Sequence, residues 1–160
     1  KLSTIEHVAS MIHEINKRFK SKERRNYQKV RLKTYFMLKP VSGISDQQAI
    51  EDVYMGIDFL HNLAIKYDID INMHLNPTYV AKGTVLEEEF MKGLYQPPTF
   101  QMMLEAVKWG VDKKISIFIG LSDEGLAIEK GSFNHDTAEE KEMIKLLETF
   151  NVSQDYRLLQ

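Results

Sequence analysis

The sequence contains no cysteine, which excludes disulfides, thiol nucleophiles, thiolate zinc sites and cysteine-ligated iron–sulfur clusters on this chain. It also lacks any apolar run of the about 18 residues that a membrane-spanning helix needs, and it does not open on a secretory signal pattern. A strong net charge is missing as well. The formal net charge is -2, so no overall attraction to nucleic acid or to an anionic membrane is expected. We therefore expect a cytoplasmic chain with no membrane partner.

The chain of 160 residues is long enough to bury one sizeable core, so we expect a single domain over residues 1–160. Hydrophobic residues make up 43% and charged residues 28% of the sequence, as in ordinary globular proteins. We find no internal repeat and no low-complexity segment.

Three segments alternate between apolar and polar residues with the period of two that is typical of β-strands. They are residues 32–38, 69–75 and 115–121. In the second and third segments one face is apolar and the other is polar or mixed. Helices can cover the apolar face, while the mixed face should line a barrel lumen, a ligand cleft or a partner.

Segments with apolar residues at helical spacing lie before and between these strands, around residues 5–19, 50–67, 85–91 and 100–109, and another follows Thr137. Ser or Thr followed three residues later by Glu or Gln predicts capping-box starts at Ser3, Ser45 and Thr137. Alternating helices and strands predict parallel strands with right-handed crossovers. The expected fold class is α/β: a fragment of a partial (β/α) barrel with a three-stranded, mostly parallel sheet and helices mainly on one face.

The stretch from Asn76 to Thr84 leaves the carboxyl end of the second strand and enters a helix. Ligands of parallel α/β folds bind at that end of the sheet. Gly83 offers a flexible turn and Thr84 a hydroxyl beside free helix amides, which suit a carboxylate or phosphate. The alternative is that Thr84 only caps its helix.

Lys39 ends the first strand in the same way and can meet an anion, or it can be a solvated lysine. Asn72 and His74 point to the polar face of the second strand. His74 can act as a general base or as a hydrogen-bonding lining residue. The five histidines show no spacing that predicts a metal site, so none is expected.

Segment 17–33 concentrates basic residues against the single acid Glu23. Such clustering can bind an RNA phosphate backbone, with Tyr27 available for stacking, or it can be a solvated helix end and loop. The candidate RNA-binding residues are Lys17, Arg18, Lys20, Lys22, Arg24 and Arg25.

Four groups of motifs resemble the later part of a radical S-adenosylmethionine (SAM) family, related to archaeosine-biosynthesis radical SAM proteins and more distantly to the Elongator catalytic subunit. They read LKTYFMLKP at 32–40, AIED at 49–52, NPT with KGT at 76–84, and GLYQPP at 93–98. Their order and spacing are similar to the family over about residues 32 to 109, half of the chain.

The resemblance implies that the first two strands are the fifth and sixth of a six-stranded partial barrel whose carboxyl ends face SAM and substrate. It implies a four-iron (4Fe-4S) cluster, held by a CxxxCxxC loop, that reduces bound SAM to a 5′-deoxyadenosyl radical. The cofactor-binding candidates on this chain are Lys39, Asn72, His74, Asn76, Thr78, Lys82, Gly83 and Thr84.

Because the cysteine loop is absent, we expect no cofactor to be held by this chain alone, and we expect SAM and the cluster to bind only with the N-terminal half of the barrel as a partner. The function implied is a contribution to a radical SAM enzyme acting on tRNA or another nucleotide. The alternative is a non-catalytic α/β binding module. The exposed sheet also predicts self-association, with a homodimer as the expected arrangement.

Overall fold

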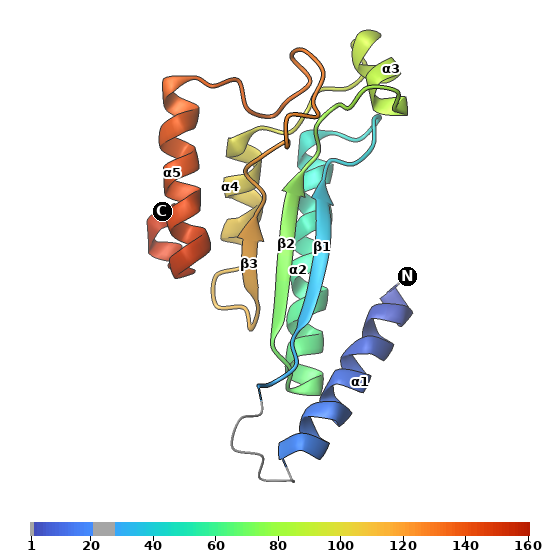
Figure 1. Cartoon of the computed structure of the whole chain (residues 1–160), viewed down its shortest axis with the longest axis vertical. Helices are drawn as coiled ribbons and strands as arrows, with labels where there is room; N and C mark the ends of the chain where they lie inside the picture. Colours follow the sequence, from blue (N-terminus) through green and yellow to red (C-terminus); the bar gives the residue numbers. More distant parts are fainter. Residues whose placement is uncertain (1, 21–27) are drawn as a thin grey trace.

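The computed structural model describes residues 2–20 and 28–160. Within these ranges five α-helices alternate with three β-strands and a short 3₁₀ helix follows (Figure 1). The elements are α1 (Leu2–Lys20), β1 (Leu32–Leu38), α2 (Asp46–Tyr67), β2 (Ile71–Pro77), α3 (Val85–Met91), α4 (Phe100–Lys108), β3 (Ser116–Ile119), α5 (Ala138–Ser153) and η1 (Tyr156–Leu159). The predicted α/β class is confirmed.

The three strands form one open sheet in the order β1-β2-β3, and both pairs of neighbours are parallel. The register aligns Tyr35 with His74 and His74 with Phe118. All carboxyl ends therefore lie at one edge of the sheet, where α3 and the long loop between β3 and α5 also lie (Figure 1). We call this the carboxyl edge and the opposite one the amino edge.

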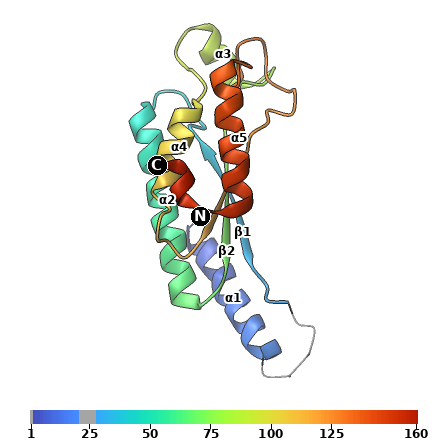
Figure 2. The ribbon, with the colours of Figure 1, turned by 90° about the vertical axis from the view of Figure 1, so that its left-hand side faces the viewer.

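Helices α2 and α4 cover one face of the sheet, as Figures 1 and 2 show. Their apolar residues pack on the buried face of β2, where Ile71, Met73 and Leu75 are almost inaccessible to solvent. The other face is left open, with Tyr35 of β1 66% exposed. This asymmetry follows from the alternation in the sequence, since burial of apolar side chains on one face drives the packing.

Helix α5 closes the outer edge of β3 instead of covering the open face. The side-chain amide of Asn151 donates to the carbonyl of Ile119 and accepts from its N–H, at 2.9 and 2.8 Å. Gln154 makes the same pair of bonds with Ile117, both at 2.8 Å. Two side-chain amides thus satisfy the backbone groups that a further strand would pair with.

Three details differ from the sequence-based expectation. Strand β2 is shifted two residues towards its carboxyl end, and β3 is shorter than predicted. Helix α1 begins at Leu2, so Ser3 lies inside the helix and does not cap it. The capping boxes at Ser45 and Thr137 are confirmed. No helix within the described ranges is long and apolar enough to cross a membrane.

Candidate functional site

Lys39 follows β1 directly at the carboxyl edge and is only 8% exposed. Its backbone adopts the left-handed conformation, with φ of 56°. Its Nζ donates to Oδ1 of Asp46 at 2.6 Å, in the first turn of α2. The buried ammonium is therefore paired with an exposed carboxylate, an arrangement that an incoming anion can compete for.

Tyr95, from the loop between α3 and α4, packs under this lysine. Its hydroxyl donates to the Lys39 carbonyl at 2.8 Å, and its ring centre lies 5.5 Å from the Lys39 Nζ. Burial raises the pKa of the Tyr95 hydroxyl to about 12, so the hydroxyl stays protonated as a donor. The Tyr95 ring and hydroxyl thus fix the unusual backbone of Lys39.

Thr78 follows β2 directly, beside the end of β1, and its N–H donates to the Leu38 carbonyl at 3.2 Å. Its side chain is 6% exposed, and its Oγ1 makes no hydrogen bond of full geometry with a described residue, although it lies near enough to the Tyr95 hydroxyl to oppose the rise that burial gives the pKa of that group. Buried hydroxyls without a partner are uncommon because desolvation costs about 1–3 kcal/mol. Thr78 thus lies beside Tyr95 at the carboxyl edge, with a buried hydroxyl whose hydrogen-bonding capacity is not filled by the described residues.

Asn76 lies on β2 two residues before Thr78, with its side chain on the open face against Gly120. A Cβ on Gly120 would lie 2.4 Å from Oδ1 of Asn76. Glycine at this position, just after β3, therefore leaves the room that the Asn76 amide occupies. Lys39, Thr78 and Asn76 thus come from two neighbouring strand ends at one edge.

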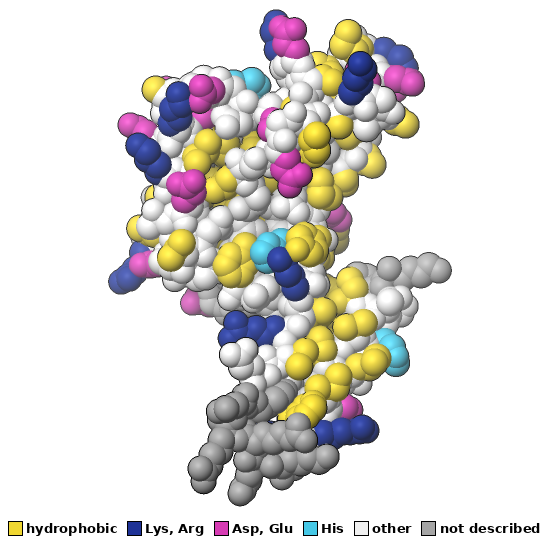
Figure 3. Space-filling model, viewed as in Figure 1, with side chains coloured by type: hydrophobic (Ala, Val, Ile, Leu, Met, Phe, Trp, Pro, Cys, Tyr) yellow, Lys and Arg dark blue, Asp and Glu magenta, His cyan; other side chains and the backbone are white. Residues whose placement is uncertain are grey.

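His74 occupies the middle of the open face, between Tyr35 and Phe118. The ring centres lie 5.3 Å from Tyr35 and 5.0 Å from Phe118, and the latter pair is stacked. Desolvation, helped by the charge of Lys33, lowers the pKa of His74. Figure 3 shows hydrophobic side chains on both sides of a histidine on this face.

The loop before α3 carries the other three candidates, Lys82, Gly83 and Thr84, all exposed. Thr84 caps the helix by accepting from the N–H of Glu87 at 3.3 Å. The N–H of Gly83, with φ of 79°, donates to Oε2 of the same Glu87 at 2.6 Å. Glu87 thus already supplies a carboxylate where the sequence predicts an external anion.

The structure therefore brings only some of the predicted cofactor residues together. Asn72 lies at the other end of β2, where it lines a cavity of about 280 Å³ at the amino edge with Arg31, Asp70 and Lys114. Sequence reasoning missed Tyr95 and Asp46 as partners of Lys39. Tyr95 lies inside the GLYQPP motif, which was the available signal.

The basic candidates divide between described and undescribed residues. Lys17, Arg18 and Lys20 form the last turn of α1, where cations are also favoured by the helix dipole. The other three, Lys22, Arg24 and Arg25, lie outside the described residues. Within the described ranges, no three His, Asp or Glu side chains gather as metal ligands do.

Fold and polar groups together define an open, parallel α/β unit with a buried lysine and a buried threonine hydroxyl at its carboxyl edge. Two proteins named archaeosine synthase subunit beta resemble the chain. The one from Methanosarcina acetivorans is 29% identical over 126 residues, 79% of this chain and 34% of the relative. The one from Thermococcus kodakarensis is 26% identical over 125 residues, 78% of this chain and 36% of the relative.

An uncharacterized protein from Methanocaldococcus jannaschii is 27% identical over 136 residues, 84% of this chain and 35% of that protein. The chain therefore spans about a third of the length of the curated relatives it matches. No family model matches the sequence, and no solved structure matches the fold. The similarity to these relatives is distant, at 26 to 29% identity.

Proposed function

We propose that this chain is part of a radical SAM enzyme that modifies tRNA, and that it contributes the last parallel strands of the catalytic barrel. The observation that carries the proposal is its similarity to two archaeosine synthase beta subunits over more than three quarters of the chain. In this proposal the carboxyl edge, with Lys39, Asn76 and Thr78, faces SAM and the RNA substrate.

The two outer strands of the sheet, β1 and β3, support a barrel that continues beside β1 only. The outer edge of β3 is closed by Asn151 and Gln154. Strand β1 is the other edge strand of the described sheet, and a groove of about 310 Å³ runs between it and α1. Helix α1 exposes Val8, Met11 and Ile15. A further parallel strand beside β1 would cover the free side of β1 and the exposed apolar residues of α1. A right-handed connection from that strand through α1 to β1 would place the strand at this position.

The implied cofactors fit the chain unequally. The cluster does not fit, because the chain has no cysteine to ligate iron. We therefore propose that its ligands come from the N-terminal half of the barrel. SAM fits better: the Thr78 hydroxyl and the Lys39 ammonium suit its carboxylate and ribose hydroxyls. The Asp46 carboxylate, which already holds Lys39, suits the amino group of SAM.

Sequencing the reading frame on the 5′ side of the Lys1 codon provides the first test. We expect three cysteine codons at CxxxCxxC spacing in the same frame. The protein encoded by the whole frame, purified and reconstituted without oxygen, should then bind four iron atoms and release 5′-deoxyadenosine from SAM on reduction. A start codon at or just before Lys1, with no cluster-bearing partner, would contradict the proposal.

The second candidate is a non-catalytic binding module, and the open face favours it. Tyr35, His74 and Phe118 present a row of aromatic rings on a face that no described element covers. Aromatic rows of this kind stack on planar ligands or on side chains of a partner. A chain that starts near Lys1 and binds RNA or protein without SAM would support this second function.

A further inference from the structure

The amino edge of the sheet contains two neighbouring cavities that the proposed SAM site does not use. The larger, of about 410 Å³, is lined by His13, Asn16, Lys17, Lys20, Lys29 and Asp68. The smaller, of about 280 Å³, includes Arg31, Asp70 and Lys114. Asp70 joins them, because Lys29 from the first cavity and Arg31 from the second both approach its carboxylate, at 3.4 and 3.7 Å.

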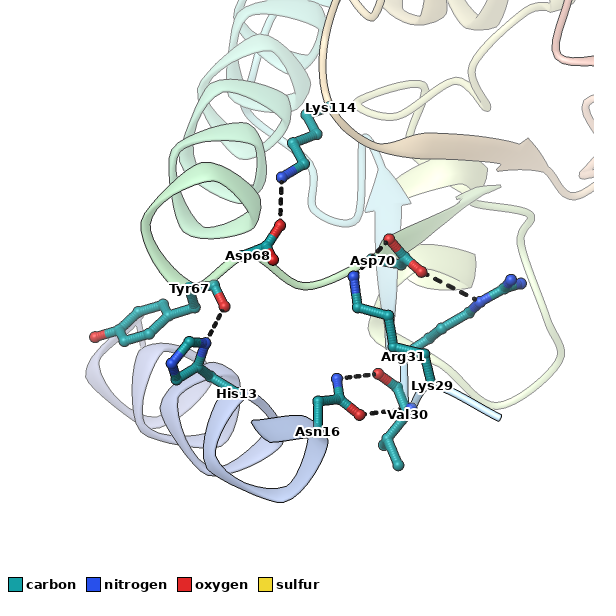
Figure 4. Close-up of polar contacts among 9 residues, drawn as sticks. All are labelled: His13, Asn16, Lys29, Val30, Arg31, Tyr67, Asp68, Asp70 and Lys114. Atoms are coloured by element: carbon teal, nitrogen blue, oxygen red, sulfur yellow. Dashed lines mark hydrogen bonds and ion pairs between the residues drawn. The ribbon is translucent and has the colours of Figure 1, made fainter. Parts of the chain in front are cut away.

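Polar contacts hold the backbone of this region in place, as Figure 4 shows. The Asn16 amide donates to the Val30 carbonyl at 3.0 Å and accepts from the Val30 N–H at 2.9 Å. Nδ1 of His13 hydrogen-bonds to the carbonyl of Tyr67, at the end of α2. The segment that enters β1 is therefore fixed against the last turns of α1 and α2, and its cations lie beside those of α1.

Among the described residues, positive charge exceeds negative charge around these cavities. The described charged residues that line them are five cations, Lys17, Lys20, Lys29, Arg31 and Lys114, and two carboxylates, Asp68 and Asp70. Both carboxylates are engaged: Lys114 pairs with Asp68 at 3.0 Å, and Asp70 takes Lys29 and Arg31. In the described part of the chain no ion pair joins Lys17 or Lys20 to a carboxylate. The described lining cations thus outnumber the carboxylates by three, and two of them, Lys17 and Lys20, are left for an external anion.

We propose that this region, the amino-edge pocket, binds phosphates of an RNA backbone through Lys17, Lys20 and Lys29. The inference rests on the proposed function, which supplies RNA as the polyanion. Lysines are point donors that suit phosphate oxygens, and several within one pocket match the regular charge of a backbone. Contacts of this type position an RNA without reading its sequence.

The position of the pocket sets its role. It lies at the edge opposite to Lys39 and Thr78, so it holds the RNA away from the reacting nucleotide. The bound backbone therefore orients the substrate, while the carboxyl edge acts on it. Removal of the pocket cations weakens RNA binding and leaves SAM binding unchanged.

Fluorescence anisotropy with an unmodified tRNA transcript tests the pocket on the 160-residue chain. The double variant Lys17→Glu/Lys20→Glu should bind at least about tenfold more weakly at low salt. The matched control is Lys130→Glu/Lys145→Glu, which makes the same change in net charge at exposed residues that line neither cavity. The control should stay within about threefold of the parent chain because distant surface charges are screened.

A second measurement keeps the test independent of folding. The variant Lys17→Ala/Lys20→Ala replaces two exposed helix residues by the best helix former, so it should fold. Its plot of log affinity against log salt should be shallower by about 1 to 2, because two phosphate contacts are lost. Equal slopes for parent and variant, or equal losses for variant and control, would overturn the pocket and leave the SAM proposal standing.

Two other outcomes would also overturn it. If the parent chain binds no tRNA at low salt, the pocket does not bind RNA, whereas the upstream cysteine codons still decide the proposed function. If the glutamate variant loses binding to vesicles of phosphatidylserine but not to tRNA, the pocket recognises a lipid surface. The proposal is supported if the Lys17 and Lys20 variants lose tRNA binding and the control variant does not.

Discussion

His74 of β2 stacks on Phe118 of β3, with ring centres 5.0 Å apart and ring planes 19° apart. The parallel register places these two residues directly opposite each other, and Tyr35 of β1 continues the row at 5.3 Å from His74. The imidazole therefore sits between two aromatic rings on an otherwise open face. This partial removal from water disfavours its charged form and lowers its pKa.

The lowered pKa of His74 predicts a loss of stability in mild acid. The unfolded chain binds the His74 proton below about pH 6.5, whereas the folded chain binds it only at lower pH. The free energy of unfolding should thus fall as the pH drops below this value, through the folded pKa. In His74→Gln this component should vanish, which urea denaturation at pH 7.5 and 5.5 will measure. Identical pH dependence in both proteins would contradict the assignment.

Thr78 allows stability and ligand binding to be separated. Its buried hydroxyl makes no hydrogen bond of full geometry with a described residue, so the isosteric Thr78→Val should keep or raise the free energy of unfolding, by up to about 1 kcal/mol. If the hydroxyl binds SAM, the same variant of the whole protein should lose about tenfold in SAM affinity, as expected for one lost hydrogen bond. Denaturation and equilibrium dialysis give the two readings.

Tyr95→Phe removes the hydroxyl that lies beside Thr78, and it serves for comparison with Thr78→Val. It removes the hydroxyl that donates to the Lys39 carbonyl, a bond of 2.8 Å in a buried setting. The carbonyl is then left without this donor, so the free energy of unfolding should fall by about 1–3 kcal/mol. Opposite signs for these two hydroxyl deletions would show that Thr78 is not needed for the fold. A similar loss of stability in both would mean that Thr78 has a structural partner.

The sequence predicted the sheet better than it predicted the site. Strand β1 begins and ends where the alternation of residues 32–38 placed it, and the buried face of β2 is the apolar one. The alternation of apolar residues and the capping residues are local signals, so a single sequence is enough to recognise them. Strand β2 ends later than predicted because Asn76 and Pro77 still pair in register with Met37 and Leu38 of β1. That pairing is a tertiary contact which local polarity does not reveal.

The contacts that build the candidate site join residues distant in sequence. Tyr95 reaches Lys39 across 56 positions, and Asn151 reaches Ile119 across 32. The anion site predicted at Thr84 depended on free amides, and the carboxylate of Glu87 takes one of them in the structure. A nearby side chain of the right charge competes with any ligand for such an amide. Composition and spacing do not show whether a side chain already occupies it.

The side-chain amides of Asn151 and Gln154 should stabilise the outer side of β3. Asn151→Leu removes one donor and one acceptor that satisfy the Ile119 backbone. We expect a loss of about 1–3 kcal/mol in the free energy of unfolding, because buried backbone groups lose their partner. The control Lys145→Leu changes an exposed residue of the same helix and should stay within about 0.5 kcal/mol. Equal values for both variants would mean that the amide is dispensable.

The other edge predicts self-association of the isolated chain. Strand β1 is an edge strand, and Tyr35 and Met37 are exposed on the open face beside it. Burial of these side chains stabilises an association by about 25 cal/mol for each Å² removed from water. Helix α5 lies along β3, so it does not cover this face. A second copy of the chain can therefore cover it, and a twofold dimer is the commonest closed arrangement.

Sedimentation equilibrium at micromolar concentration measures this directly. We expect a mass near twice the 18.6 kDa of the monomer. Tyr35→Arg places a charge in the middle of the exposed patch and should return the chain to a monomer, since burying an unpaired charge is costly. The control Met55→Arg changes a residue of α2 that is 65% exposed on the helix layer, and it should leave the dimer intact. A monomer mass for the parent chain would contradict association through the open face, because the apolar area there would then be too small to offset the entropy of joining two molecules.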